Sequence, residues 1–184
     1  MARYIVLIRG INVGGRQKLA MADLRAVLAG LGCTSARTLL QSGNAVFDAE
    51  GRAGRLERDI AAGIEQTAGL SVRCLVREQA ELDAVIAANP FGHVTDGARL
   101  YAMFLSAQPD PRLLAEHDPA GLDPGRISLG DRVIYQWCPA GYAQAPPLAV
   151  YTEKRLQVAV TARNWNTVTK LASLASTLAG GYSS

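Results

Sequence analysis

The fold is set by Tyr4-Ile5-Val6-Leu7-Ile8-Arg9-Gly10-Ile11-Asn12-Val13-Gly14-Gly15-Arg16-Gln17-Lys18. The apolar run Tyr4–Ile8 predicts a buried strand, and three glycines follow within six positions. Glycine lets the backbone take positive φ and approach a ligand closely. Because Arg9, Arg16 and Lys18 add positive charge, the loop after the strand is suited to an anion.

The elements that follow this loop predict an α+β fold. Apolar residues at helical spacing predict helices over 21–31 and 56–69. Strands are expected at 37–40 and 45–48, joined by the tight turn Gln41-Ser42-Gly43-Asn44, and at 72–76, where alternation predicts one buried face. The order strand, helix, strand, strand, helix, strand is the ferredoxin-like split βαβ plan, in which an antiparallel sheet carries two helices.

The second half repeats this order. A helix over 78–88 is expected to stop at Asn89-Pro90, because a residue before proline avoids the α region. The later elements are a strand at 99–105, a helix at 111–117, a hairpin of 127–129 and 133–138 over Gly130-Asp131, a helix at 148–157, a strand at 158–161 and a final helix from Trp165. We therefore predict two ferredoxin-like subdomains in tandem, 1–77 and 98–184, with a linker helix and connector at 78–97 and a C-terminal helix. The repeat lies in the element order, since no repeat of residues is evident.

Composition indicates a cytoplasmic protein with a sizeable core. The 184 residues contain no apolar run of membrane-helix length and no signal sequence, and the three cysteines are too far apart for a disulfide framework or paired metal ligands. The net charge is +3, yet residues 1–40 hold six bases against one acid, 41–123 seven against thirteen, and 124–184 six against two. If the two basic ends meet in space, they create a positive field that the net charge hides. Scattered, solvated bases are the alternative.

The glycine loop is a near miss to the phosphate-binding G-x-x-x-x-G-K-[ST] motif. In Gly10-x-x-x-x-Gly15-Arg16-Gln17, arginine replaces the lysine, glutamine replaces the hydroxyl that ligates Mg²⁺, and the next helix starts late. These differences argue against ATP hydrolysis of the P-loop type and leave a backbone cradle for an anion. The alternative is a structural turn in which Arg9 pairs with a carboxylate and Asn12 caps the backbone.

Two other polar segments could join this loop in one pocket. The tip Gln41–Asn44 could contribute its side-chain amides and hydroxyl to a ligand. The alternative is a turn whose side chains form hydrogen bonds with its own backbone. The segment Arg163-Asn164-Trp165 opens the last helix, whose N-terminal amides attract an anion, although capping by Asn164 or Asn166 also explains the asparagines. The candidate ligand-binding residues are Arg9, Asn12, Gly14, Gly15, Arg16, Gln41, Ser42, Asn44, Arg163, Asn164 and Trp165.

Catalytic and metal-binding residues are not evident. His93 and His117 are isolated from each other and from the cysteines, which argues against zinc, and no carboxylate pair suits acid and base catalysis. We expect no cofactor and no metal.

Four motifs resemble those of the bacterial domain-of-unknown-function (DUF) family numbered sixteen-ninety-seven. They are Leu7-Ile8-Arg9-Gly10-Ile11-Asn12-Val13-Gly14-Gly15, Gln41-Ser42-Gly43-Asn44 before Val46-Phe47, Ala87-Ala88-Asn89-Pro90-Phe91, and Thr161-x-Arg163-Asn164-Trp165-Asn166-Thr167-Val168-x-Lys170-Leu171. The resemblance implies two ferredoxin-like subdomains and brings no established activity or cofactor. The chain departs from the family at Arg16, where lysine is usual, and at Ala145-Pro146-Pro147-Leu148, where relatives carry a basic stretch.

Three functions remain open at this point. The first is binding of a phosphate-bearing small molecule in a basic, amide-rich pocket. The second is nucleic-acid binding, which the shared fold plan and basic ends favour, although Phe47, with Tyr4 opposite, gives few stacking aromatics. The third is an enzyme acting on a phosphorylated substrate. We expect no membrane partner, and the sequence predicts no oligomeric state.

Overall fold

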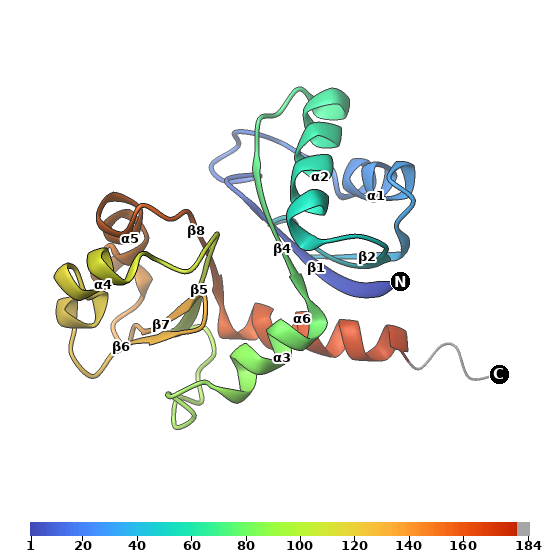
Figure 1. The fold of residues 1–184 in the computed structure, drawn as a ribbon. Coiled ribbons are helices and arrows are strands. Elements are labelled where there is room, and N and C mark those ends of the chain that lie inside the picture. Colours follow the sequence, from blue (N-terminus) through green and yellow to red (C-terminus); the bar gives the residue numbers. More distant parts are fainter. Residues whose placement is uncertain (180–184) are drawn as a thin grey trace. The chain divides into compact units, whose positions relative to one another are not determined.

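A computed structural model describes residues 1–179 of the chain. It contains two four-stranded antiparallel sheets with helices, which confirms the predicted α+β class (Figure 1). The chain divides into two compact units: unit 1 is Met1–Leu82 with the chain from Lys170 onward, and unit 2 is Asp83–Thr169. Residues 180–184 of the predicted second subdomain lie outside the described residues.

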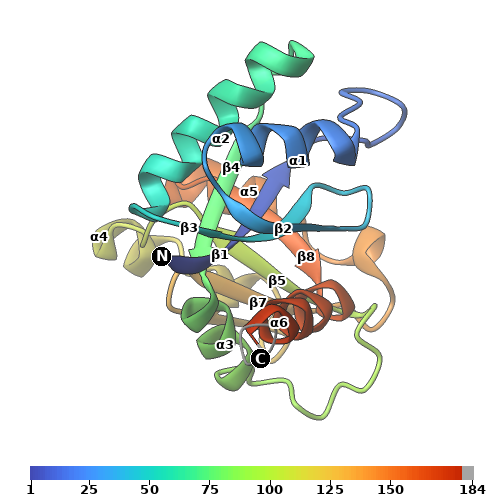
Figure 2. The ribbon, with the colours of Figure 1, turned by 90° about the vertical axis from the view of Figure 1, so that its right-hand side faces the viewer.

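Unit 1 is built around its first strand. Its elements are β1 (Ala2–Arg9), α1 (Met21–Gly30), β2 (Thr34–Leu39), β3 (Asn44–Ala49), α2 (Ala53–Ala68) and β4 (Arg73–Glu78), and α3 (Gln79–Ala87) begins in unit 1 and continues into unit 2. The strand order is β2-β3-β1-β4, so β1 lies between β3 and β4. Figure 2 shows α1 and α2 side by side on one face of this sheet.

The run Tyr4–Ile8 is buried on both faces of the sheet. Tyr4, Val6 and Ile8 belong to the core cluster formed with α1 and α2. Ile5 and Leu7 point to the opposite face, and each is only 1% exposed. Burial on both faces explains why the strand reads as a continuous apolar run instead of an alternating pattern.

The prediction that β4 is buried on one face only was wrong. Leu75 and Arg77 on its second face are buried, with Arg77 only 5% exposed. The Nη1 atom of Arg77 donates to the carbonyl oxygen of Val76 at 2.9 Å and lies 3.8 Å from the Glu57 carboxylate. Burial of a cation requires such partners, which is why alternation alone misjudged its position.

Unit 2 repeats the order of elements. It holds β5 (Leu100–Leu105), α4 (Pro111–Glu116), the short 3₁₀ turn η1 (Pro119–Leu122), β6 (Ile127–Gly130), β7 (Val133–Trp137), the short 3₁₀ turn η2 (Tyr142–Gln144), α5 (Leu148–Leu156), β8 (Val160–Asn164) and the start of α6 (Trp165–Ala179). Its strand order is β6-β7-β5-β8. One core cluster joins Met103, Leu105 and Ile134 of the sheet with Leu148 and Leu156 of α5.

Two local predictions in unit 2 are corrected. The hairpin turns over Asp131-Arg132, because Gly130 pairs with Val133, and Arg132 takes the positive φ of 49°. Strand β8 runs to Asn164, three residues beyond its predicted end, because Ala162 to Asn164 pair with β5. Within residues 1–179, none of the helices combines the length and hydrophobicity that crossing a bilayer requires.

A paired carboxylate joins the two central strands β1 and β3 of unit 1 and gives a pH prediction. Arg3 binds Asp48 through Nε at 2.8 Å and Nη2 at 2.9 Å, and its Nη1 donates to the Ala175 carbonyl oxygen of α6 at 2.7 Å. The hydrogen bond from Arg3 lowers the pKa of Asp48 below its usual 3.8, against the opposing effect of burial. A depressed folded pKa stabilises the fold above the unfolded pKa, and this contribution is lost as pH falls through the folded pKa.

Asp48→Asn is therefore expected to lower the free energy of unfolding by about 2 kcal/mol at pH 7, intermediate between exposed and buried ion pairs. The difference from the wild type should shrink below pH 3.8, as Asp48 itself becomes protonated. Urea unfolding at pH 7 and at pH 3 measures both. Asp59→Asn is the control, since its partner Arg55 is 74% exposed, and an equal loss in that variant would contradict the prediction.

Candidate functional site

The glycine loop after β1 folds into a small hairpin. The amide of Arg16 donates to the Val13 carbonyl oxygen at 3.1 Å, and the amide of Asn12 donates to that of Gln17 at 3.1 Å. Gly14 and Gly15 form the turn with φ of 59° and 74°, the positive values that a two-residue type I′ turn requires. Two amides of the predicted backbone cradle, those of Asn12 and Arg16, are thus used within the hairpin and are not available to an anion.

The Asn12 side chain joins the hairpin to the tip between β2 and β3. Its Nδ2 donates to the carbonyl oxygens of Gln41 at 2.6 Å and Leu19 at 3.0 Å, and its Oδ1 accepts from the Leu19 amide at 3.0 Å. The loop and the tip, which sequence reasoning placed in one pocket, are thus neighbours. Asn12 itself is fully engaged in holding them, as the capping alternative proposed.

The tip is a tightly closed turn. Gly43 takes φ of 79°, and its carbonyl oxygen accepts from the Ile8 amide at 2.8 Å. Asn44 is fully buried, and its Nδ2 donates to the Leu39 carbonyl oxygen at 3.1 Å and to Ser42 Oγ at 2.9 Å. Gln41 and Ser42 are exposed, so they are the residues of the tip that can meet a ligand.

The glycine loop and the end of β1 carry three exposed cations. Arg9, Arg16 and Lys18 are all exposed, and the hairpin that carries Arg16 projects from the rest of unit 1 (Figure 2). With the amide of Gln41 and the hydroxyl of Ser42, these side chains give a surface that is basic and rich in donors.

The third predicted segment belongs to unit 2. Arg163 lies on β8, and its Nη1 donates to the Ala162 carbonyl oxygen at 2.8 Å. Burial lowers the pKa of Arg163 to about 10, which leaves it charged at neutral pH. Asn164 caps α6, because its Oδ1 accepts from the Thr167 amide at 3.0 Å.

The start of α6 is closed by the chain itself. The amide of Trp165 donates to the Gly97 carbonyl oxygen at 3.0 Å, and its ring lies 6.3 Å from that of Tyr135. A Cβ on Gly97 would lie 3.1 Å from the Asn166 amide nitrogen, so the connector approaches this helix start closely. The helix N-terminus therefore has fewer amides to offer an anion than the sequence suggested.

Sequence reasoning missed a counterpart of Arg163 in unit 1. Arg77, on the corresponding strand β4, donates to the carbonyl oxygen of the residue before it, as Arg163 does on β8. Each arginine is followed, after one residue, by a helix, α3 or α6. The motif around Arg163 is therefore one of two equivalent strand ends.

Aromatic residues of the unit 1 sheet are not available for stacking on bases. Tyr4 and Phe47 pair across β1 and β3 with ring centroids 6.0 Å apart, and they are 2% and 0% exposed. An RNA-binding sheet of the ferredoxin-like kind presents such rings on its open face. The sheet aromatics here belong to the core.

The thiols and imidazoles form no metal centre in the described part of the chain, where no group of three possible ligands occurs. Burial raises the pKa of Cys74 to about 12 and that of Cys138 to about 11. Both thiols therefore stay protonated at neutral pH and are poor nucleophiles.

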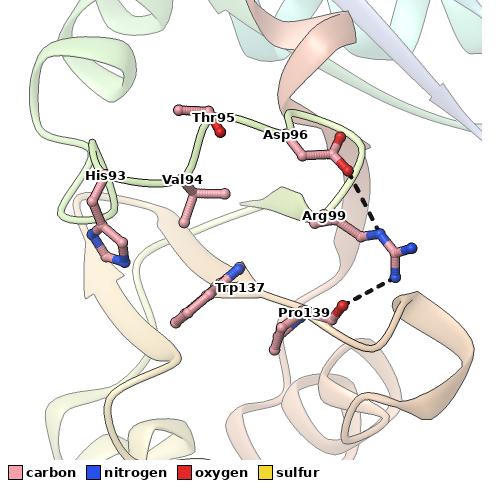
Figure 3. Close-up of a pocket in the computed structure, with 7 residues that line it drawn as sticks. All are labelled: His93, Val94, Thr95, Asp96, Arg99, Trp137 and Pro139. Atoms are coloured by element: carbon pink, nitrogen blue, oxygen red, sulfur yellow. Dashed lines mark hydrogen bonds and ion pairs between the residues drawn. The ribbon is translucent and has the colours of Figure 1, made fainter.

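A pocket in unit 2 was not predicted from the sequence. It encloses about 400 Å³ and is shown in Figure 3. Its lining residues come from the connector before β5 and from the end of β7: His93, Val94, Thr95, Asp96, Arg99, Trp137 and Pro139. The one sequence signal for this pocket is Trp137, which stands directly before the loop Cys138-Pro139-Ala140-Gly141.

Known proteins resemble this chain in fold and in sequence. The solved structure of conserved bacterial protein SP0830 from Streptococcus pneumoniae matches with a TM-score of 0.72 and 22% sequence identity, over 95% of this chain and 98% of that one. At this identity the likeness concerns the fold alone. No curated protein matches the chain. The family described as "Protein of unknown function (DUF1697)" matches residues 1–135, and the chain therefore belongs to the DUF1697 family.

Proposed function

We propose that unit 1 binds a phosphate-bearing small molecule where the glycine hairpin meets the Gln41–Asn44 tip. The observation that carries this proposal is the hydrogen bond from Asn12 Nδ2 to the Gln41 carbonyl oxygen, 2.6 Å long. It holds a projecting hairpin that carries Arg16 beside a tip that exposes Gln41 and Ser42. Charge-assisted hydrogen bonds to phosphate oxygens are stronger than neutral ones, which favours an anionic ligand at this surface.

The ligand would be bound by side chains. Because the amides of Asn12 and Arg16 are bonded within the hairpin, the phosphate would lie against the arginine and lysine side chains, with the exposed amide and hydroxyl of the tip at its edge. The sequence nominates no proton acceptor beside this site, so we propose binding and assign no catalytic step to it.

The test is a titration with inorganic phosphate and with ATP, followed by the backbone amide signals of Gly14, Gly15 and Gly43 in 1H–15N spectra. We expect saturable shifts at low ionic strength that weaken with added salt, because exposed charges are screened over roughly 10 Å at 0.1 M. Arg16→Ala/Lys18→Ala should weaken binding by about tenfold or more, since each charge-assisted contact contributes roughly 1.5–3 kcal/mol.

The matched control is Arg52→Ala/Arg58→Ala, which removes the same charge from exposed positions at and near the start of α2. Arg52 follows the end of β3 that pairs with Ala2, at the opposite end of the sheet from the loop. If both double variants lost phosphate affinity equally, the ligand would be attracted by the net charge of the protein and not by this site. Absence of saturable shifts in the wild type would reject the site.

Arg163, Asn164 and Trp165 of unit 2 remain predicted ligand-binding residues. The positive charge that Arg163 keeps at neutral pH supports the prediction. The same titration on Arg163→Lys tests it, because that change keeps the charge and removes the guanidinium fork. An unchanged affinity would reject this role for Arg163.

We also propose that the chain holds two ferredoxin-like subdomains, 1–77 and 98–184, joined by a linker helix and connector at 78–97. The support is the element order and the strand orders β2-β3-β1-β4 and β6-β7-β5-β8, in which the first strand of each unit lies between the third and the fourth. The split βαβ plan requires this arrangement.

A further inference from the structure

We propose that the pocket around Trp137 binds a free α-amino acid with an uncharged side chain. Asp96 binds its ammonium group, and Arg99 binds its carboxylate. All the lining residues belong to unit 2, so this site does not depend on the phosphate site proposed for unit 1.

The lining of the pocket presents one charge of each sign, side by side. Asp96 Oδ2 lies 3.7 Å from Arg99 Nε (Figure 3). This distance exceeds that of a hydrogen bond, so the two groups do not saturate each other. The Asp96 side chain is 62% exposed and that of Arg99 43%, and an ion pair so open to water is weak. A ligand with its own pair of charges can therefore bind to both groups without breaking a strong contact.

Both charged groups are held in place by the backbone. Asp96 Oδ1 accepts from the Ala98 amide at 3.0 Å, and Arg99 Nη1 donates to the Pro139 carbonyl oxygen at 3.1 Å. These bonds use one carboxylate oxygen and one terminal guanidinium nitrogen, which leaves Asp96 Oδ2 and Arg99 Nη2 for a ligand. Because the side chains are already ordered, binding costs less conformational entropy.

A pair of opposite charges disfavours ligands with a single charge. A phosphate or a lone carboxylate would meet Asp96 as well as Arg99, and a lone amine would meet Arg99 as well as Asp96. An α-amino acid carries its ammonium and carboxylate groups on one carbon, so each can lie against the opposite charge. Apart from the imidazole of His93, the lining has no further ionisable group. A charged ligand side chain would thus lack a partner.

Trp137 forms a wall of the pocket and adds a donor. The His93 ring stands perpendicular to the indole with centroids 5.3 Å apart, and the Arg126 guanidinium carbon lies 5.8 Å from the indole centroid. These contacts cover the ring, so the ligand meets its edge, whose nitrogen is turned toward the connector in Figure 3. In the described part of the chain the indole N–H has no hydrogen-bond partner, and it can donate to a carboxylate.

The size of the pocket suits such a ligand. Its volume of about 400 Å³ falls in the usual range of small-molecule sites, roughly 300–1,000 Å³. Val94 and Pro139 add apolar surface to the lining, against which an uncharged side chain can pack.

A second ion pair provides a matched control. Asp123 and Arg126 are also three residues apart in the chain, and Arg126 Nη1 lies 3.7 Å from Asp123 Oδ2. The cavity that they line holds only about 50 Å³, far below the roughly 300 Å³ at which small-molecule sites begin. This pair therefore has the same chemistry without room for an amino acid.

The experiment titrates the full chain with L-leucine and with L-serine and follows the indole N–H signal of Trp137, assigned with Trp137→Phe. The matched negatives are the N-acetyl derivatives, which lack the ammonium group, and the amides, which lack the carboxylate. We expect a saturable shift with at least one of the two amino acids. Its derivatives should bind about tenfold more weakly or worse, because each lacks one charge-assisted contact.

Two variants then test the residues. Asp96→Asn should weaken amino-acid binding by about tenfold, because it removes the charge and keeps the Oδ1 acceptor for the Ala98 amide. Asp123→Asn should leave the affinity within about twofold of the wild type, since it changes an ion pair outside the site.

Several results would overturn the proposal. They are no saturable shift of the Trp137 signal with either amino acid, equal affinity for an amino acid and its derivatives, or equal affinities of Asp96→Asn and Asp123→Asn. If Asp96→Asn did not fold, the derivatives would still test both contacts on the wild type. Because the phosphate titration reports on Gly14, Gly15 and Gly43, failure of one site can be told from failure of the other.

Discussion

Gly43→Ala is expected to destabilise unit 1 by about 3 kcal/mol, the sum of backbone strain and overpacking. The φ of Gly43 is 79°, and an added Cβ would lie 2.8 Å from both the Cβ of Ile8 and the Cδ1 of Ile11. The Cβ of Ile8 is fixed to a buried strand and cannot move aside. Thermal unfolding should show a midpoint lowered by roughly 6–12 °C for a chain of this size.

Gly32→Ala provides the matched control. Gly32 has φ of 78°, and nothing lies within 4 Å of the position of its Cβ. It should therefore show only the backbone strain, about 1 kcal/mol. If urea unfolding gave the same loss for both variants, the close approach of the tip to β1 would be contradicted.

Much of the fold could be predicted because its signals are local. The apolar run Tyr4–Ile8 gave β1, and Leu56, Ile60 and Ile64 at helical spacing gave α2, which ends at Gly69 with φ of 66°. Each of these patterns depends only on which side of one helix or strand is buried. The spacing of apolar residues within that element is enough to predict it.

Burial that depends on other elements could not be predicted. The position of Arg77 in the alternating pattern predicts an exposed side chain. In the structure Arg77 is buried, and its guanidinium donates to the Val76 carbonyl oxygen. The sequence of β4 does not show what packs on the face that carries Arg77. β4 does not read as a continuous apolar run as β1 does, because its second face includes an arginine whose burial is made possible by a hydrogen bond.

The two units also share an equivalent hydrogen bond that only the folded structure reveals. Glu57 of α2 accepts from the Val76 amide of β4 at 2.8 Å, and Glu153 of α5 accepts from the Val160 amide of β8 at 3.2 Å. In both units the second helix thus binds a backbone donor of the edge strand beside the first strand. Glu57 lies 19 residues before Val76 whereas Glu153 lies 7 residues before Val160, so comparison along the sequence does not align these glutamates.

The candidate site was predicted in part. Loop and tip could be grouped because both are rich in polar side chains. The bond from Asn12 to the main-chain oxygen of Gln41 could not be predicted, since every residue carries that oxygen. The Trp137 pocket was out of reach for a similar reason. His93 and Trp137 lie far apart in the chain, and only the folded connector brings their rings together.

Asn12→Ala is expected to destabilise unit 1 by about 3 kcal/mol, because three hydrogen bonds are lost and alanine disfavours positive φ. The φ of Asn12 is 55°. Asn12→Gly separates the two causes, since glycine accepts this φ while losing the same bonds, and it should lose about 2 kcal/mol. Urea unfolding measures both values, and a loss below about 0.5 kcal/mol in the alanine variant, typical of ordinary surface changes, would contradict the role of the amide.

Asn12→Asp distinguishes the bonds from one another. The carboxylate keeps an acceptor for the Leu19 amide but loses the Nδ2 donor to Gln41 and Leu19. Hydrogen exchange at the Leu19 amide should therefore speed up in the alanine and glycine variants and stay slow in the aspartate variant. Phosphate affinity should fall in all three variants although Arg16 and Lys18 remain, because the hairpin is no longer held against the tip. An unchanged affinity in the glycine variant would mean that charge alone, without this clamp, explains binding at the loop.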